Sequence, residues 1–278
     1  MRKSFVNQKK PFVVGVLRGK SALFNMATMK NAEYEGADAF DLHLNWMPEA
    51  DRSEESLKKL FAFTKLPVLV LYYLEKTPFN NDPPPRWDER LDVQMRAIDC
   101  GAAGIDIQAH YFDNDSKSSL IGSNLSFAAA NPAEISLRPE IIDKQMDVIE
   151  RVHAKGAEVL LSSHVGVELS CEQAVDLALE MEKRKPDIVK IVSPCNSEEQ
   201  LGEVLKTIVT LRKELHTPFV YLGGGEKGKL SRIFGAALDN CLCFAVSRYD
   251  ETHAFIQPPI RTAKSVLEEM KTDVLIQN

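Results

Sequence analysis

Short apolar stretches alternate with amphipathic stretches along this chain. The apolar stretches are rich in β-branched residues, and their near-continuous apolarity is typical of parallel strands that are buried on both faces. They lie at Phe12–Leu17, Ala39–Leu44, Pro67–Tyr73, Gly104–Ala109, Glu158–Ser163, Ile188–Val192, Pro218–Leu222 and Cys241–Val246. The pattern therefore predicts eight buried strands.

Between these runs, apolar residues recur with the period of an amphipathic helix. We expect helices over Ser53–Phe63, Trp87–Cys100, Pro139–Lys155, Cys171–Lys183, Ser197–Leu215 and Thr262–Met270. Local signals support two of these starts. Pro139 suits the first turn of a helix, and Ser197 with Gln200 three residues later matches a capping box.

Eight strands that alternate with helices predict a (β/α)8 barrel, and we expect residues 1–278 to form one such domain. A chain of 278 residues is long for one average domain, but barrels of roughly 250 residues routinely fold as one. A doubly wound open sheet is the alternative. The dinucleotide pattern G-x-G-x-x-G is absent after the first strand, since Gly15 and Gly19 do not match it.

Two connections, residues 77–86 and 113–138, are longer than a barrel requires. Both follow strands and therefore lie at the C-terminal face, where barrels hold their active sites. Long loops at such a face often act as lids or as specificity elements. Insertions that only make oligomer contacts are the alternative.

The charge balance restricts the partners of this protein. The chain carries 34 Lys and Arg against 40 Asp and Glu, a net charge of −6 at neutral pH. This balance argues against a nucleic-acid surface and against binding to anionic lipid. We therefore expect a small-molecule ligand.

The cysteines and the N-terminal residues indicate in which cellular compartment the protein is expected. The cysteines are Cys100, Cys171, Cys195, Cys241 and Cys243. Their number is odd and they lack zinc-site spacing, so we expect free thiols and no metal. No apolar signal region follows the basic start, and no apolar run is long enough to span a bilayer. We expect a cytoplasmic protein.

Lys190 is the most unusual residue of the predicted strands. It lies in the middle of Asp187-Ile188-Val189-Lys190-Ile191-Val192, where a buried parallel strand rarely accepts a lysine. Desolvation disfavours the ammonium form and makes the free amine available as a nucleophile for a carbonyl carbon. The alternative is a structural lysine that pairs with a carboxylate inside the barrel.

His164 ends the strand that precedes the strand of Lys190. A side chain at the carboxyl end of a barrel strand opens into the mouth of the barrel, so the two residues are expected to converge. Histidine is the usual proton-transfer group near neutral pH. A capping or hydrogen-bonded structural histidine is the alternative.

Arg232 and Gln257 are candidates for ligand binding. Arg232 follows the turn Gly225–Ser231, whose glycines and helix start suit a carboxylate or phosphate. Gln257 precedes Pro258 and Pro259 in a stiff loop after the last strand. The alternatives are a surface arginine and an ordinary loop glutamine.

Together these features resemble type I 3-dehydroquinate dehydratases over nearly the whole chain. The segments that carry the resemblance are Lys10–Ser21, Gly36–Asp38, Ser163-His164, Asp187–Ile191, Gly228–Arg232 with Gly235, and Gln257. The segment around Lys190 is similar to the Schiff-base lysine motif of the family, and Gly228–Arg232 is similar to its anion-binding turn.

The resemblance implies a mechanism in which Lys190 forms an iminium with a ring ketone. His164 then removes the acidified proton and returns one to the departing hydroxyl. Arg232 and Gln257 would hold the substrate carboxylate. The resemblance also implies that neither a metal nor an organic cofactor is required, and that the protein is a homodimer.

The chain departs from this family at several substrate-binding positions. Asp41, Leu42 and His43 stand where the family has Glu-x-Arg, and Tyr73 stands where it has a second arginine. A nearby acidic residue is retained as Glu75, and Thr252 or His253 replaces a serine of the lid. These changes leave the substrate open. The alternatives are a divergent member that acts on another keto acid, a class I aldolase, and a non-catalytic barrel that binds a metabolite.

Overall fold

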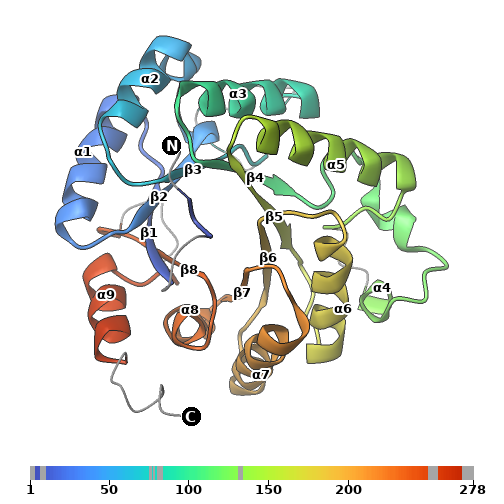
Figure 1. Cartoon of the computed structure of the whole chain (residues 1–278). Coiled ribbons are helices and arrows are strands. Elements are labelled where there is room, and N and C mark those ends of the chain that lie inside the picture. Colours follow the sequence, from blue (N-terminus) through green and yellow to red (C-terminus); the bar gives the residue numbers. More distant parts are fainter. Residues whose placement is uncertain are drawn as a thin grey trace.

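The computed structural model describes residues 4–6, 11–74, 77, 79, 84–130, 134–249 and 256–270. In this part of the chain, parallel strands form a ring with helices around it (Figure 1). The strands are β1 (Phe12–Leu17), β2 (Ala39–His43), β3 (Val68–Leu71), β4 (Gly104–Gln108), β5 (Glu158–His164), β6 (Ile188–Pro194), β7 (Phe219–Gly224) and β8 (Leu242–Ala245). All eight predicted strands are confirmed, with ends that shift by one or two residues.

The sheet is nearly closed into a barrel, since only β7 and β8 lack a strand pairing with each other among the described residues. Each strand pairs in parallel with its neighbour in sequence from β1 to β7, and β1 also pairs with β8. At the remaining seam, Cys241 N donates to Phe219 O at 2.9 Å, and the Asn240 side chain bonds both backbone groups of Tyr221. The fold is therefore a single-domain (β/α)8 barrel, and the alternative of an open sheet is wrong.

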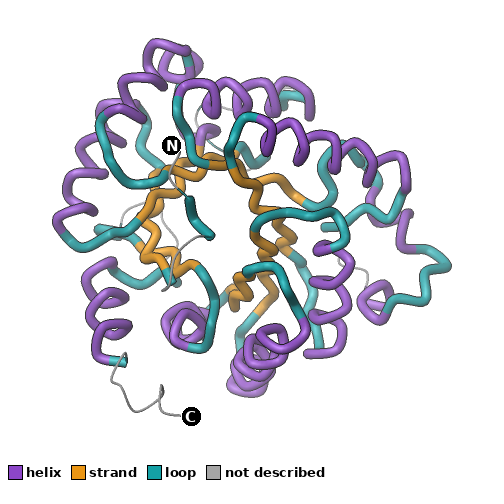
Figure 2. The backbone as a smooth tube through the Cα atoms, in the orientation of Figure 1, coloured by secondary structure: helices purple, strands orange, loops and turns teal. Residues whose placement is uncertain are grey.

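Helices cover the outer face of the ring (Figure 2). They are α1 (Ala22–Tyr34), α2 (Glu54–Ala62), α3 (Trp87–Cys100), α4 (Ser126–Ala130), α5 (Pro139–Ala154), α6 (Cys171–Glu182), α7 (Glu198–Glu214), α8 (Gly228–Ala237) and α9 (Ile260–Glu269). The six predicted helices are all present. At α7, Ser197 and Gln200 make the expected capping box.

Helix α1 was not predicted from the sequence. Leu23, Phe24 and Tyr34 are apolar or aromatic but exposed on it, so apolar residues do not follow a single stripe. The amphipathic period that identifies the other helices is therefore absent here.

Residues that alternate along each strand point into or out of the ring. The inward cluster includes Val14, Leu160, Ile188 and Phe244, and Phe5 from the N-terminal segment packs with it. The outward residues pack against the helices in a second, larger cluster. The apolar inward residues fill the barrel, and polar inward residues follow them toward the carboxyl ends of the strands.

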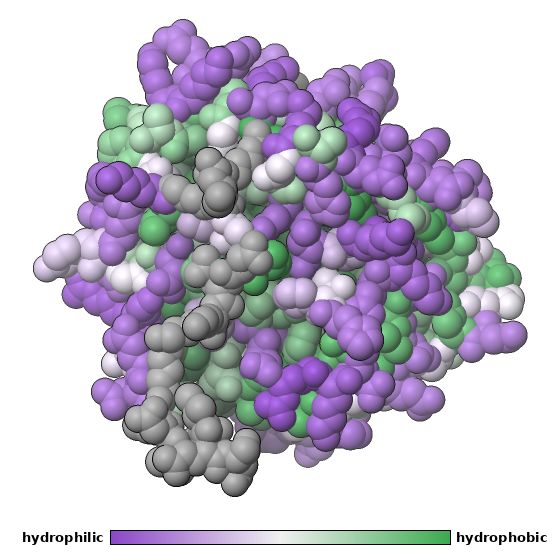
Figure 3. Space-filling model, in the orientation of Figure 1, coloured by the Kyte–Doolittle hydropathy of each residue, from purple (hydrophilic) through white to green (hydrophobic). Residues whose placement is uncertain are grey.

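The surface agrees with the composition. The face shown in Figure 3 is largely hydrophilic, with hydrophobic residues in separate areas. All five cysteines are free thiols, as expected. Among the described residues, no helix combines the length and the apolarity needed to cross a membrane.

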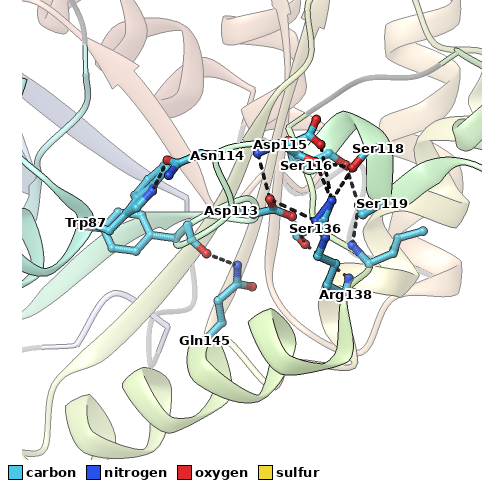
Figure 4. Close-up of polar contacts among 12 residues, drawn as sticks. Trp87, Asp113, Asn114, Asp115, Ser116, Ser118, Ser119, Ser136, Arg138 and Gln145 are labelled. Carbon is cyan, nitrogen blue, oxygen red and sulfur yellow. Dashed lines mark hydrogen bonds and ion pairs between the residues drawn. The ribbon is translucent and has the colours of Figure 1, made fainter.

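Half of the first long connection falls outside the described residues, because only 77, 79 and 84–86 of residues 77–86 are described. The second, residues 113–138, contains a 3-10 helix (Ser116–Leu120) and α4. Its two ends are joined by polar contacts (Figure 4). Ser136 Oγ donates to Asp113 Oδ2 at 2.5 Å, and Arg138 lies 3.6 Å from Asp113 Oδ1.

Arg184 fixes this connection to the barrel. The guanidinium donates to Ala109 O at 2.7 Å and to Ser136 O at 2.6 Å, and it also bonds the side chain of Gln145. Arg184 is only 1% exposed. The connection consequently begins and ends at buried hydrogen bonds. Its last part lies against β5, because Ser163 Oγ donates a hydrogen bond to Glu134 O.

Candidate active site

Lys190 extends from β6 into the barrel. Its Nζ lies 4.9 Å from the centre of the Phe244 ring, which belongs to the inward cluster. The side chain is buried, with 6% of the residue exposed. Nζ donates to Asp106 Oδ2 at 3.1 Å and lies 3.4 Å from the Tyr73 hydroxyl. The carboxylate that a structural lysine would require is therefore present.

Asp106 on β4 is the centre of the polar contacts. Besides Lys190, its carboxylate accepts hydrogen bonds from Tyr73 at 2.7 Å and from Ser162 at 2.6 Å. Burial raises the pKa of Asp106, and the nearby Lys190 partly opposes this rise. Residues in β4, β5 and β6, with Tyr73 two residues after β3, thus bring a cation, a carboxylate and two hydroxyls together.

His164 ends β5, as predicted, and its ring packs edge-on against Tyr73 with 5.1 Å between the ring centres. Its Nδ1 is buried and has no hydrogen-bond partner among the described residues. Burial, followed by the charges of Lys190 and Arg232, holds the pKa of His164 well below its ordinary value. The imidazole is therefore neutral at neutral pH, which is the form that accepts a proton.

Asp41 and His43 lie on the same inward face, on β2. His43 Nε2 is 3.3 Å from Asp41 Oδ2, and both side chains are buried. The His43 ring lies 6.3 Å from the Tyr73 ring between centres. The structure therefore brings Asp41, His43 and Tyr73 to the side of the barrel mouth that also holds Asp106.

Arg232 lies in the second turn of α8 and is 6% exposed, so the alternative of a surface arginine is wrong. Its Nε has no hydrogen-bond partner among the described residues. Burial, with Arg18 nearby, lowers the pKa of Arg232 to about 10, which leaves the guanidinium charged at neutral pH. The mouth of the barrel thus holds a buried cation available to an anion.

The turn before Arg232 depends on glycine. A Cβ at Gly228 would lie 2.3 Å from Gly223 O, so only glycine lets α8 start directly against the end of β7. The next residue, Lys229, donates to the Tyr249 hydroxyl at 2.6 Å, and that hydroxyl donates to Gln257 O at 2.8 Å. This chain of contacts links the turn of Arg232 to Gln257.

Gln257 is partly buried, and its Oε1 has no partner among the residues that the structure describes. Glu75, Thr252 and His253 lie outside the described residues, so the structure gives them no position.

Asp106 and Ser162 were not predicted as site residues from the sequence. Asp106 carries the same signal as Lys190, because it is a charged residue in the middle of the buried strand Gly104–Gln108. Ser162 gave no comparable signal. His110 was also missed, and it follows β4 with its Nδ1 3.1 Å from Glu134 Oε2. Glu134 comes from the long connection, so spacing along the chain does not indicate this contact.

A closed parallel barrel whose buried polar residues gather toward the carboxyl ends of its strands is the arrangement of a (β/α)8-barrel enzyme. Comparison with known proteins gives a narrower assignment. The family model described as type I 3-dehydroquinase matches residues 14–274. The chain belongs to this family.

Similar curated proteins carry the same description at low identity. The 3-dehydroquinate dehydratase of Methanocaldococcus jannaschii is 24% identical over 223 residues, which cover 78% of this chain and 81% of that protein. The 3-dehydroquinate dehydratase of Aromatoleum aromaticum is 25% identical over 139 residues, 50% of this chain and 52% of that protein. The second match thus spans only about half of the relative.

Solved structures support the fold. The 3-dehydroquinate dehydratase of Geobacillus kaustophilus superposes with a TM-score of 0.74 at 15% identity and covers 97% of this chain and 94% of that chain. The type I enzyme of Clostridium difficile, solved with covalently modified comenic acid, has a TM-score of 0.74 at 15% identity and covers 97% and 95%.

Proposed function

We propose that this protein dehydrates 3-dehydroquinate to 3-dehydroshikimate through an imine on Lys190. The observation that carries the proposal is the position of Lys190 inside the barrel of a type I 3-dehydroquinase family member, with a neutral His164 at the end of the adjacent strand. A buried lysine and a neutral histidine are the two groups that imine-based elimination needs.

In this mechanism, the Lys190 amine attacks the ring ketone and water leaves to give an iminium. The iminium withdraws electrons from the adjacent carbon, and His164 takes the proton from it. The electron pair expels the ring hydroxyl as water, with a proton returned by His164. Hydrolysis then releases the product and the amine. The iminium is itself the electron sink, so the reaction requires neither a metal nor an organic cofactor.

Arg232 and Gln257 hold the substrate carboxylate in this proposal. The unpartnered Nε of Arg232 supports the role, because a buried guanidinium gains charge-assisted hydrogen bonds from a bound carboxylate. Asp41 and His43, at the positions where the family has Glu-x-Arg, also contact the substrate in this proposal. Glu75 and His253 keep the roles that the family resemblance gives them, as an acidic group near the mouth and as a residue of the lid.

An absorbance assay with purified protein and 3-dehydroquinate tests this function, because the product is conjugated and the substrate is not. We expect steady growth of the product absorbance.

The comparisons favour this reaction over a class I aldolase and over a non-catalytic barrel. One observation favours a second candidate, an enzyme of this family that acts on a different keto acid. His43 and Tyr73 replace two arginines of the family, and inside the barrel His43 contacts Asp41 while Tyr73 contacts Asp106. A lysine adduct without product absorbance would indicate such an enzyme.

Substitution of His164 by alanine should separate proton transfer from imine formation. We expect turnover to fall by about 10²- to 10⁴-fold, the usual contribution of a positioned acid–base group. The imine should still form and should still be trapped by borohydride. His153→Ala is the matched control, because His153 pairs with Asp187 on the outside of the barrel. Full turnover by His164→Ala would refute the assigned role.

The pH profile gives a second test of His164. The base form is needed, and the pKa of His164 is lowered, so kcat/KM should stay on its plateau when the pH falls to about 6.5, the ordinary pKa of histidine. Activity should decline only at lower pH, as the imidazole takes up a proton. A decline centred at or above the ordinary value would contradict the neutral histidine.

We further propose a cytoplasmic homodimer, which the family resemblance suggests. Light scattering of the full chain tests the oligomeric state, and a mass of twice 31.1 kDa is expected. A monomer at micromolar concentration would contradict the dimer.

A further inference from the structure

We infer that Tyr73 and Asp106 form a proton relay for imine formation, in which the Tyr73 phenol is the catalytic acid that protonates the departing water. The inference rests on the proposed imine at Lys190. It assigns imine formation to one pair of side chains and the later removal of the carbon-bound proton to His164.

The contacts among the three groups form a closed triangle. Asp106 Oδ2 accepts from Lys190 Nζ at 3.1 Å and from the Tyr73 hydroxyl at 2.7 Å, and that hydroxyl lies 3.4 Å from Nζ. During imine formation, the leaving oxygen is bonded to the same carbon as Nζ. A hydroxyl beside Nζ is therefore beside the oxygen that must be protonated.

Each member of the relay is in the protonation state that its role needs. Burial and the neighbouring Asp106 hold the pKa of Tyr73 well above its ordinary value, so the phenol keeps its proton and acts as a donor. Burial raises the pKa of Asp106, which makes its carboxylate a better proton acceptor than an exposed one. Ser162 donates to the other oxygen of Asp106 at 2.6 Å and orients the carboxylate.

The position of Tyr73 is also fixed by packing. Its ring contacts the His164 ring edge-on at 5.1 Å between centres, and its hydroxyl is 3.0 Å from Ser162 Oγ. The phenol is thus directed to the amine and the ring to the histidine. Tyr73 stands where the family resemblance has an arginine, and these contacts give the replacement a role in proton transfer.

The relay balances without an external acid. Asp106 takes one proton from the Lys190 ammonium, and the amine attacks the ketone carbon, so the C–N bond forms and the C=O π pair moves to oxygen. A nitrogen-bound proton passes to that oxygen and gives the carbinolamine. Tyr73 then protonates the hydroxyl, the C–O bond breaks, and the nitrogen lone pair forms the C=N bond. Asp106 returns its proton to Tyr73. An ammonium and a ketone have become an iminium and water.

The test is the rate at which borohydride-trapped adduct accumulates on the full-length protein after rapid mixing with 3-dehydroquinate. We expect Tyr73→Phe to slow adduct formation by about 10²- to 10⁴-fold, with the same final adduct mass. Tyr72→Phe is the matched control, since Tyr72 packs with the outer cluster and its hydroxyl bonds Arg52. Its rate should equal that of the unsubstituted protein.

Asp106→Asn is a second variant, because an amide keeps the shape of the carboxylate but does not take a proton from the ammonium. It should slow adduct formation to a similar degree. A purely structural role would reduce the final yield or the melting temperature and leave the rate of the folded fraction unchanged. Unchanged rates in either folded variant overturn the relay. Absence of any adduct in the unsubstituted protein would instead contradict the proposed function, so the two failures are distinguishable.

Discussion

Substitution of Lys190 by methionine or alanine is expected to lower turnover of 3-dehydroquinate by at least about 10³-fold, the scale seen when a covalent nucleophile is removed. Neither side chain can form the imine, and the remaining groups only bind the substrate. Circular dichroism should show that the barrel remains folded. The assay uses the product absorbance, and near-normal turnover by a folded variant would contradict the role of Lys190.

The same variants should change how stability depends on pH. Without Lys190, the largest effect that opposes burial is lost and only the hydrogen bonds from Ser162 and Tyr73 still lower the pKa of Asp106, so the folded state binds a proton more tightly than the unfolded state. The stability from this group is present at low pH and is lost as the pH rises through the raised pKa. In urea unfolding, the free energy of unfolding of Lys190→Met should therefore be closest to that of the unsubstituted protein at acidic pH.

Of the substitutions proposed for this protein, Arg184→Ala is expected to lower the free energy of unfolding most. It leaves Ser136 O and the Gln145 amide oxygen buried without their donor, and it removes one of the three hydrogen bonds to Ala109 O, which keeps those from Ser136 N and Gln145 Nε2. Each unsatisfied buried acceptor costs about 1–3 kcal/mol, which suggests a total of about 3–5 kcal/mol after partial relaxation. At about 2–4 °C per kcal/mol, the melting temperature should fall by roughly 10 °C.

Lys183→Ala is the control for this prediction. Lys183 is adjacent in sequence, but its side chain is 68% exposed, and among the described residues it pairs with Glu180 alone. Its removal should change the free energy of unfolding by less than about 0.5 kcal/mol. If the two variants melt at the same temperature, the connection 113–138 is not fixed by Arg184.

The strands could be predicted because burial on both faces makes them continuously apolar, as at Pro218–Leu222. The ends were less certain. His164 and Pro194 extend β5 and β6 beyond the apolar runs, because backbone pairing with the next strand continues past them. Helix α1 escaped prediction for the opposite reason, since Leu23 and Phe24 are apolar without being buried.

Part of the site could also be predicted. A lysine inside a buried strand and a histidine at the end of the adjacent strand indicated Lys190 and His164 without any coordinates. The partners of Lys190 were harder to predict, because Asp106 lies two strands away around the ring and 84 positions away in sequence. Closure of the barrel brings such residues together, and the linear pattern does not encode their distance. For Arg232 the sequence predicted a ligand-binding residue and left a surface arginine as the alternative, and the structure buries the side chain where α8 starts close against β7.

The most direct test of the account is the location of the trapped imine. The protein is incubated with 3-dehydroquinate and borohydride, digested, and examined by mass spectrometry. We predict a single reduced adduct on the peptide that contains Lys190, and its loss in Lys190→Met. An adduct on another lysine, or turnover with no adduct on Lys190, would contradict the central claim.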